Sequence, residues 1–172
     1  PGLYSTVTPT GWSLLGNGSV VDIISAGYGA GSVASDGAQF LDLIGGGVGT
    51  LPCGIRQSVS LVGGTAYSFS FDYNGDYSSR VLDYAISGVL SGSVSASALN
   101  VYPVFGQVTP WQSFQTTFVA PATASYTIEF LTLSGTFESP FIDNVALNPT
   151  AVPDSGSTLL LCLGGAAAVL LS

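Results

Sequence analysis

The apolar and polar positions of this chain alternate with a period of two over most of its length. In residues 66–73, every second side chain is aromatic and those between are small or acidic. Such alternation predicts a β-strand with one buried side and one solvent-facing side. The same pattern, interrupted by turn signals, predicts further strands at 19–25, 38–44, 54–62, 80–87, 111–120, 124–133 and 141–148.

Before residue 149, we find no long stretch with the 3.6-residue period of an amphipathic helix. Residues 91–107 are less regular, and we expect an edge strand and a long loop there. Many short strands with turns between them are typical of two packed antiparallel sheets. The sequence therefore predicts an all-β domain over residues 1–148, an antiparallel β-sandwich of the jelly-roll type.

The pattern changes abruptly at the C-terminal end. Residues 149–158 are polar and contain prolines and a glycine, which favours an extended linker. Residues 159–171 are apolar without interruption, which predicts one membrane-anchoring transmembrane helix over 159–172. The alternative is a core helix of the sandwich, but a fold of period two has no place for a helix that is apolar on all sides.

This C-terminal block is short for a membrane span. As a helix it would be about 20 Å long, whereas the apolar core of a bilayer is about 30 Å thick. Small side chains in its second half favour close packing against a neighbouring helix. They are Gly164, Gly165, Ala166, Ala167 and Ala168.

Composition excludes several functions. Ten acidic residues face only two basic ones, both arginines, and the net charge of -8 repels phosphate backbones, which excludes nucleic-acid binding. The absence of His and Lys removes the usual imidazole base and the Schiff-base nucleophile. A pair of carboxylates is enough to hydrolyse a glycoside, but Glu138, one of only two glutamates, lies in a predicted loop. We therefore expect a protein that is not an enzyme.

The sequence contains no Met, and we expect that a secretory signal peptide has been cleaved, with simple truncation as the alternative. Cys53 lies in the body and Cys162 in the apolar block, so we expect no disulfide between them. Cys53 is expected to be a small buried apolar residue.

The junction of linker and apolar block resembles the PEP-CTERM sorting signal, in its Val-Pro-Asp-x-Gly-Ser-Thr variant. The resemblance implies export to the periplasmic or cell-surface side, anchoring in the inner membrane, and processing by an exosortase. It also implies an association with extracellular polysaccharide. The matching residues are Val152, Pro153, Asp154, Ser155, Gly156, Ser157 and Thr158.

The body resembles the galactose-binding-like jelly rolls, including the DUF642-type domains that precede such signals. The resemblance covers residues 11–147 and rests on an ordered set of short motifs. The set includes Gly11-Trp12, Val21-Asp22, DGAQFLDL at 36–43, GIRQ at 54–57, YSFSFD at 67–72, WQSF at 111–114 and FIDNV at 141–145. It implies that Asp22, Asp36 and Asp143 cluster around a structural Ca²⁺. The alternative, which we prefer, is that Asp143 and Asn144 cap or hydrogen-bond locally.

A second calcium hypothesis concerns residues 72–78, where oxygen-bearing side chains alternate and Asp83 falls at the twelfth place, as in an EF-hand loop. The Asn74-Gly75 pair between alternating strands is also a strong β-hairpin signal. We prefer the hairpin. No cofactor other than calcium is expected.

Sugar recognition uses aromatic faces and planar polar groups on loops. The aromatic residues in predicted loops are Tyr28, Tyr77, Tyr102, Phe105 and Phe137. Packing in the core is the simpler role for each of them.

Two hypotheses about function follow. The first is a non-catalytic, membrane-tethered extracytoplasmic protein that is associated with exopolysaccharide or binds a glycan. The second is a small accessory subunit docked on the periplasmic face of an integral membrane complex, such as a respiratory or photosynthetic one.

Overall fold

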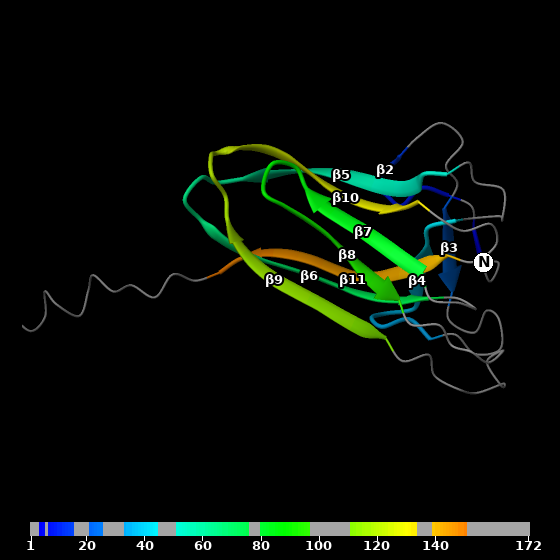
Figure 1. The fold of residues 1–172 in the computed structure, drawn as a ribbon. Coiled ribbons are helices and arrows are strands. Elements are labelled where there is room, and N and C mark those ends of the chain that lie inside the picture. Colours follow the sequence, from blue (N-terminus) through cyan, green and yellow to red (C-terminus); the bar gives the residue numbers. More distant parts are fainter. Residues whose placement is uncertain are drawn as a thin grey trace, which may run out of the picture.

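The computed structural model describes residues 4–5, 7–15, 21–25, 33–44, 51–75, 80–96, 111–133 and 139–150. These residues form two antiparallel sheets that face each other (Figure 1). Sheet A contains, in spatial order, β1 (Tyr4–Ser5), β3 (Asp22–Ser25), β4 (Gln39–Asp42), β11 (Pro140–Pro149), β6 (Ala66–Gly75) and β9 (Gln112–Val119). Sheet B contains β2 (Ser13–Leu14), β5 (Cys53–Leu61), β10 (Ala124–Thr132), β7 (Arg80–Ile86) and β8 (Leu90–Ala96).

The predicted all-β sandwich is confirmed. Each of the eight predicted runs contains a strand whose described bounds lie close to the expected ones. The edge strand expected after residue 90 is β8, which pairs only with β7. Alternation placed these strands correctly because each one buries one side against the opposite sheet.

The hairpin predicted at Asn74-Gly75 is wrong. Strand β6 continues through both residues and pairs with β11 and β9 in sheet A, whereas β7 belongs to sheet B. Asn74 is only 1% exposed, and its side chain accepts a hydrogen bond from the Gly75 backbone N–H at 2.7 Å. The pairing of β6 with β11 extends through Asn74 and Gly75. This pairing keeps both residues in the strand, so they do not form a two-residue turn.

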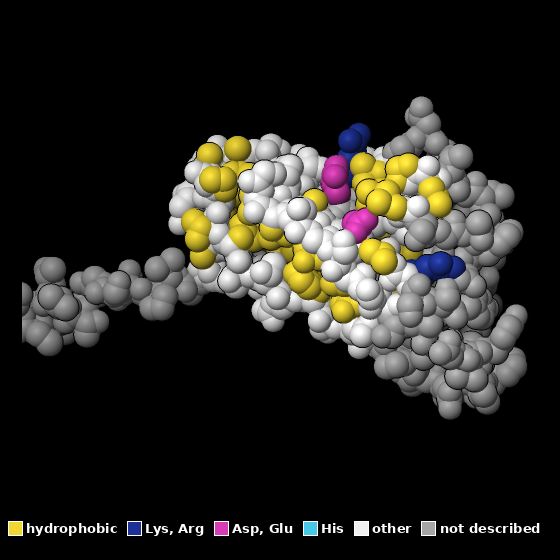
Figure 2. Space-filling view, in the orientation of Figure 1, with side chains coloured by type: hydrophobic (Ala, Val, Ile, Leu, Met, Phe, Trp, Pro, Cys, Tyr) yellow, Lys and Arg dark blue, Asp and Glu magenta, His cyan; other side chains and the backbone are white. Residues whose placement is uncertain are grey.

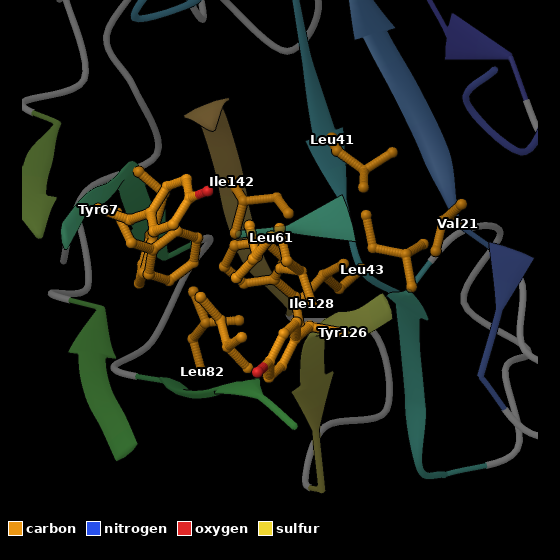
Figure 3. Close-up of a cluster of buried hydrophobic side chains, with 14 of the residues drawn as sticks. Val21, Leu41, Leu43, Leu61, Tyr67, Leu82, Tyr126, Ile128 and Ile142 are labelled. Carbon is orange, nitrogen blue, oxygen red and sulfur yellow. The ribbon is translucent and has the colours of Figure 1, made fainter. Parts of the chain in front are cut away.

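The main core lies between the two sheets (Figure 3). Phe69, Phe71 and Phe130 are almost fully buried there, as the alternation predicted. The Phe71 ring stacks on Phe114 at 4.9 Å between centroids and meets the edge of Phe130 at 5.0 Å. Each such side chain contributes roughly 1.5–3 kcal/mol by leaving water. Cys53 is buried, as expected.

A second apolar cluster lies on the outer face of sheet A. Phe40 packs against Trp111 at 5.5 Å and Phe141 at 5.1 Å, and the Trp111 indole N–H donates to the Val33 carbonyl at 2.8 Å. Residues 33–38 therefore cover one end of this outer face.

The linker, the sorting-like motif and the apolar block beyond residue 150 lie outside the described residues. Among the residues that are described, none belongs to a helix long and apolar enough to cross a membrane. The predicted C-terminal helix therefore stays a prediction.

Candidate functional site

Polar side chains line the outer face of sheet B. The alternate residues of β5, β10, β7 and β8 point into the core, so the residues between them point outward. The cross-strand pairs place Arg56 opposite Glu129, and Glu129 opposite Ala85. We call this surface the polar face; it is formed by Arg56, Ser58, Asp83, Ala85, Ser91, Ser93, Thr127, Glu129 and Leu131.

Two shallow hollows adjoin on the polar face. One, of about 300 Å³, is bordered by Glu129, Asp83 and the β8 serines. The other, of about 280 Å³, is bordered by Arg56, Ser58 and Thr127. Because Arg56 and Glu129 are cross-strand neighbours, the two hollows meet along this pair. Figure 2 shows acidic side chains with a basic side chain beside them over β5, β10 and β7.

Small residues keep the polar face shallow. Its β8 positions are Ser91 and Ser93, and Ala85 accompanies Asp83 on β7. The Ser93 hydroxyl donates to the Asp83 carboxylate, and Ser58 and Ser125 share a hydrogen bond of 2.8 Å. The surface thus offers a guanidinium, two carboxylates and several hydroxyls at the level of the sheet. Its chemistry suits a ligand rich in hydroxyl groups.

The predicted grouping of Asp22, Asp36 and Asp143 around a metal is not formed. Within the described ranges, no three His, Cys, Asp or Glu side chains are placed to hold a metal ion. Asp143 instead accepts a hydrogen bond from the Asp36 backbone N–H at 3.0 Å and another from the Asn144 backbone N–H at 2.8 Å. The bond from Asn144 is local, as the preferred alternative expected, whereas the bond from Asp36 joins residues 107 positions apart. Calcium binding itself stays a prediction.

Asp22 belongs to a different part of sheet A, where it lies directly opposite Asp42. The pKa of Asp42 is raised to about 6, chiefly by burial and less by the nearby Asp22 carboxylate, against hydrogen bonds from the Ser139 hydroxyl and the Ile44 backbone N–H that lower it. This site is a close pair of carboxyl groups in the sheet, away from the polar face.

The EF-hand-like interpretation of residues 72–83 is also wrong. Asp72 lies on sheet A and Asp83 on sheet B, so they do not share a loop. Asp72 instead accepts hydrogen bonds from Ser113 at 2.6 Å, from the Asn144 amide at 3.1 Å and from Ser35. Burial by itself raises the pKa of Asp72, but these three hydrogen bonds outweigh it and hold the pKa below 3.8. Through the hydrogen bond from Ser35, Asp72 thus holds the segment 33–38 against sheet A.

The other predicted site residues lie outside the described residues. These are the aromatic candidates Tyr28, Tyr77, Tyr102, Phe105 and Phe137, the sorting motif 152–158, and the small residues 164–168. The sequence reasoning missed the polar face because it searched the loops. The sequence shows the polar positions of each alternating strand, but it does not show which strands lie next to one another.

No protein-family model and no curated protein matches this sequence. Solved structures do match. TmCBM61, solved with β-1,4-galactotriose, is 15% identical at a TM-score of 0.53, over 82% of this chain and 90% of its own. A cyclase from Fischerella sp. TAU, solved with 4-(1H-indol-3-yl)butan-2-one, is 15% identical at 0.55, over 87% and 90%.

The xylanase 10B of Clostridium thermocellum, solved as CBM22-1-GH10 modules with xylohexaose, is 14% identical at a TM-score of 0.53. That match covers 88% of this chain and 28% of the xylanase chain. Identities this low establish the fold alone. The chain has the β-sandwich fold found in carbohydrate-binding modules, which agrees with the galactose-binding-like jelly roll expected from the sequence.

Proposed function

We propose that this protein is a non-catalytic glycan-binding domain and that the polar face of sheet B binds the glycan. The observation that carries the proposal is the cross-strand pair of Arg56 and Glu129 at the meeting of two hollows, with Asp83 nearby on β7. Vicinal hydroxyl groups of a sugar pair well with planar guanidinium and carboxylate groups, which offer two donors or two acceptors side by side.

The shape of the polar face supports a ligand that lies flat across several strands. The hollows are shallow, and serines, Thr127 and Ala85 lie around the charged pair, so among the described residues few large side chains stand in the path of successive sugar units. None of the described residues that form the polar face is aromatic, and Tyr84, which borders one hollow, packs inward against Phe71 and Phe114. We therefore expect hydrogen bonding to dominate recognition. TmCBM61 and the xylanase modules, which share the fold, were solved with oligosaccharides.

The proposal includes the location of the protein. The sorting-like motif 152–158 and the apolar block 159–171 support an extracytoplasmic domain that is held at the inner membrane and processed by an exosortase. A domain on a tether close to newly exported polysaccharide would meet its ligand at high local concentration.

A glycan array followed by calorimetric titration tests the proposal. We expect an array hit, and a loss of affinity of about tenfold or more in Arg56→Ala and in Glu129→Ala, since a hydrogen bond to a charged group contributes about 1.5–3 kcal/mol. Gln115→Ala, on the outer face of sheet A, is the control and should bind normally. Incubation with the bound glycan should give no hydrolysis product. A silent array, or equal affinity in all three variants, would refute the assignment.

A further inference from the structure

A larger hollow than the two on the polar face lies between the sheets. It has a volume of about 730 Å³, and we call it the inter-sheet groove. Sheet A contributes residues of β3, β4 and β11, and sheet B contributes residues of β5 and β10. Trp12, just before β2, also borders it. A volume of this size falls within the range of small-molecule sites.

The groove exists because β11 has no partner among the described strands along most of one side. Strand β4 pairs with β11 only at Phe141 and Ile142, so the rest of β11 pairs with β6 alone. A bulge between Asp143 and Ala146 also shifts the register, and Asn144 adopts a φ of +48° there. Beyond Ile142, the side of β11 that faces away from β6 is therefore open next to the core.

The walls of the groove are apolar but incompletely covered. Val145 and Leu147 on β11 face Val59 on β5, and all three are only half-buried although they pack against the core. Deeper in the groove, Ile55 and Ile128 are almost fully buried. Filling such a space with an apolar ligand removes further surface from water, which favours binding.

The charges around the groove select against an anion. Neither arginine of the chain is among the described residues that line it. Its one lining carboxylate among the described residues, Asp143, already accepts two backbone hydrogen bonds. The other polar side chains of the lining are neutral: Gln39, Gln57, Asn144, Ser60, Tyr67 and Trp12. An anion would find no cation there and would be repelled by a chain of net charge -8.

We infer that the inter-sheet groove binds an uncharged, largely apolar small molecule with one hydrogen-bonding group. Its apolar body lies between β11 and β5, and its polar group reaches the amides at the rim. This site is separate from the polar face, so binding there does not depend on glycan recognition.

Two dyes with the same ring system test the inference on the full chain. N-phenyl-1-naphthylamine is neutral, and 8-anilino-1-naphthalenesulfonate carries a sulfonate. We expect the neutral dye to bind with at least about tenfold higher affinity in a fluorescence titration. Equal affinities, or tighter binding of the sulfonate, would overturn the charge argument.

Matched variants locate the bound dye. Val59→Phe fills the groove and should weaken binding of the neutral dye by at least about tenfold. Val119→Phe, at an exposed position on β9, makes the same change elsewhere and should bind like the parent chain. If Val59→Phe does not fold, Val145→Phe fills the groove from the opposite wall. Unchanged binding in a folded groove-filling variant would overturn the inference, and any uptake by the apolar tail is the same in all variants.

Energy transfer gives an independent readout. Trp12 borders the groove, whereas Trp111 packs in the cluster on the outer face of sheet A. Dye emission excited through tryptophan should fall sharply in Trp12→Phe and much less in Trp111→Phe.

The other candidate occupant is the apolar segment 159–171 of the chain itself. Dye binding that is absent in the full chain and appears only when Leu160 and Leu163 are changed to serine would assign the groove to that segment and overturn the inference.

Discussion

At the scale of single residues, the facing carboxyl groups of Asp22 and Asp42 are the least expected feature of sheet A. Asp42 receives hydrogen bonds from the Ile44 backbone N–H at 2.8 Å and from the Ser139 hydroxyl, yet burial dominates and raises its pKa to about 6. An ionised carboxylate at this position lacks water and faces a second carboxylate. Its protonation state therefore affects stability.

The direction in which pH changes the stability follows from the raised pKa of Asp42. With a pKa of about 6 in the folded protein and 3.8 in the unfolded chain, the folded state binds more protons between these values. Stability therefore falls as pH rises from about 4 to 6. Asp42→Asn should stabilise the protein by up to about 3 kcal/mol at pH 7 and change little at pH 4. Urea denaturation at both pH values measures this, and an equal difference at both would contradict it.

At the scale of elements, alternation was a reliable guide to each strand but not to its neighbours. The aromatic side of β6 could be predicted because Tyr67, Phe69 and Phe71 bury themselves whichever strands lie beside them. The failed hairpin at Asn74-Gly75 depended on pairing, which is a long-range property of the chain. The polar face depends on the same information, since Arg56 and Glu129 are far apart in sequence and meet only through the register of β5 and β10.

The β5–β10 pairing also explains a glycine. A Cβ on Gly54 would overlap the Phe130 backbone carbonyl, which cannot move without breaking the sheet. Gly64, in the turn after β5, has a φ of +77° and open space around it. We expect Gly54→Ala to cost about 3 kcal/mol or more through overpacking, and Gly64→Ala about 1 kcal/mol through backbone strain alone. Chemical denaturation compares them, and equal costs would show that the close approach is unimportant.

At the scale of the whole molecule, the two proposed ligand sites use different parts of one sandwich. The polar face depends on side chains that project from sheet B. The inter-sheet groove depends on the side of β11 that β4 does not pair with beyond Ile142. A ligand in the groove would add apolar contacts between the sheets and so stabilise the fold by mass action. A glycan on the polar face would contact one sheet only.

The proposed membrane tether is the remaining property of the whole chain. The last hydrogen bond of the described domain joins the Thr150 backbone N–H to the Ala66 carbonyl at 2.8 Å. A chain ending at Thr150 keeps every described core contact, so its melting temperature should lie within about 2 °C of that of the full chain. It should also bind the same glycan.

After fractionation of expressing cells, the full chain should sediment with membranes and the shortened chain should not, because only the full chain carries the apolar block 159–171. Sedimentation of both with membranes would place the attachment in the sandwich itself.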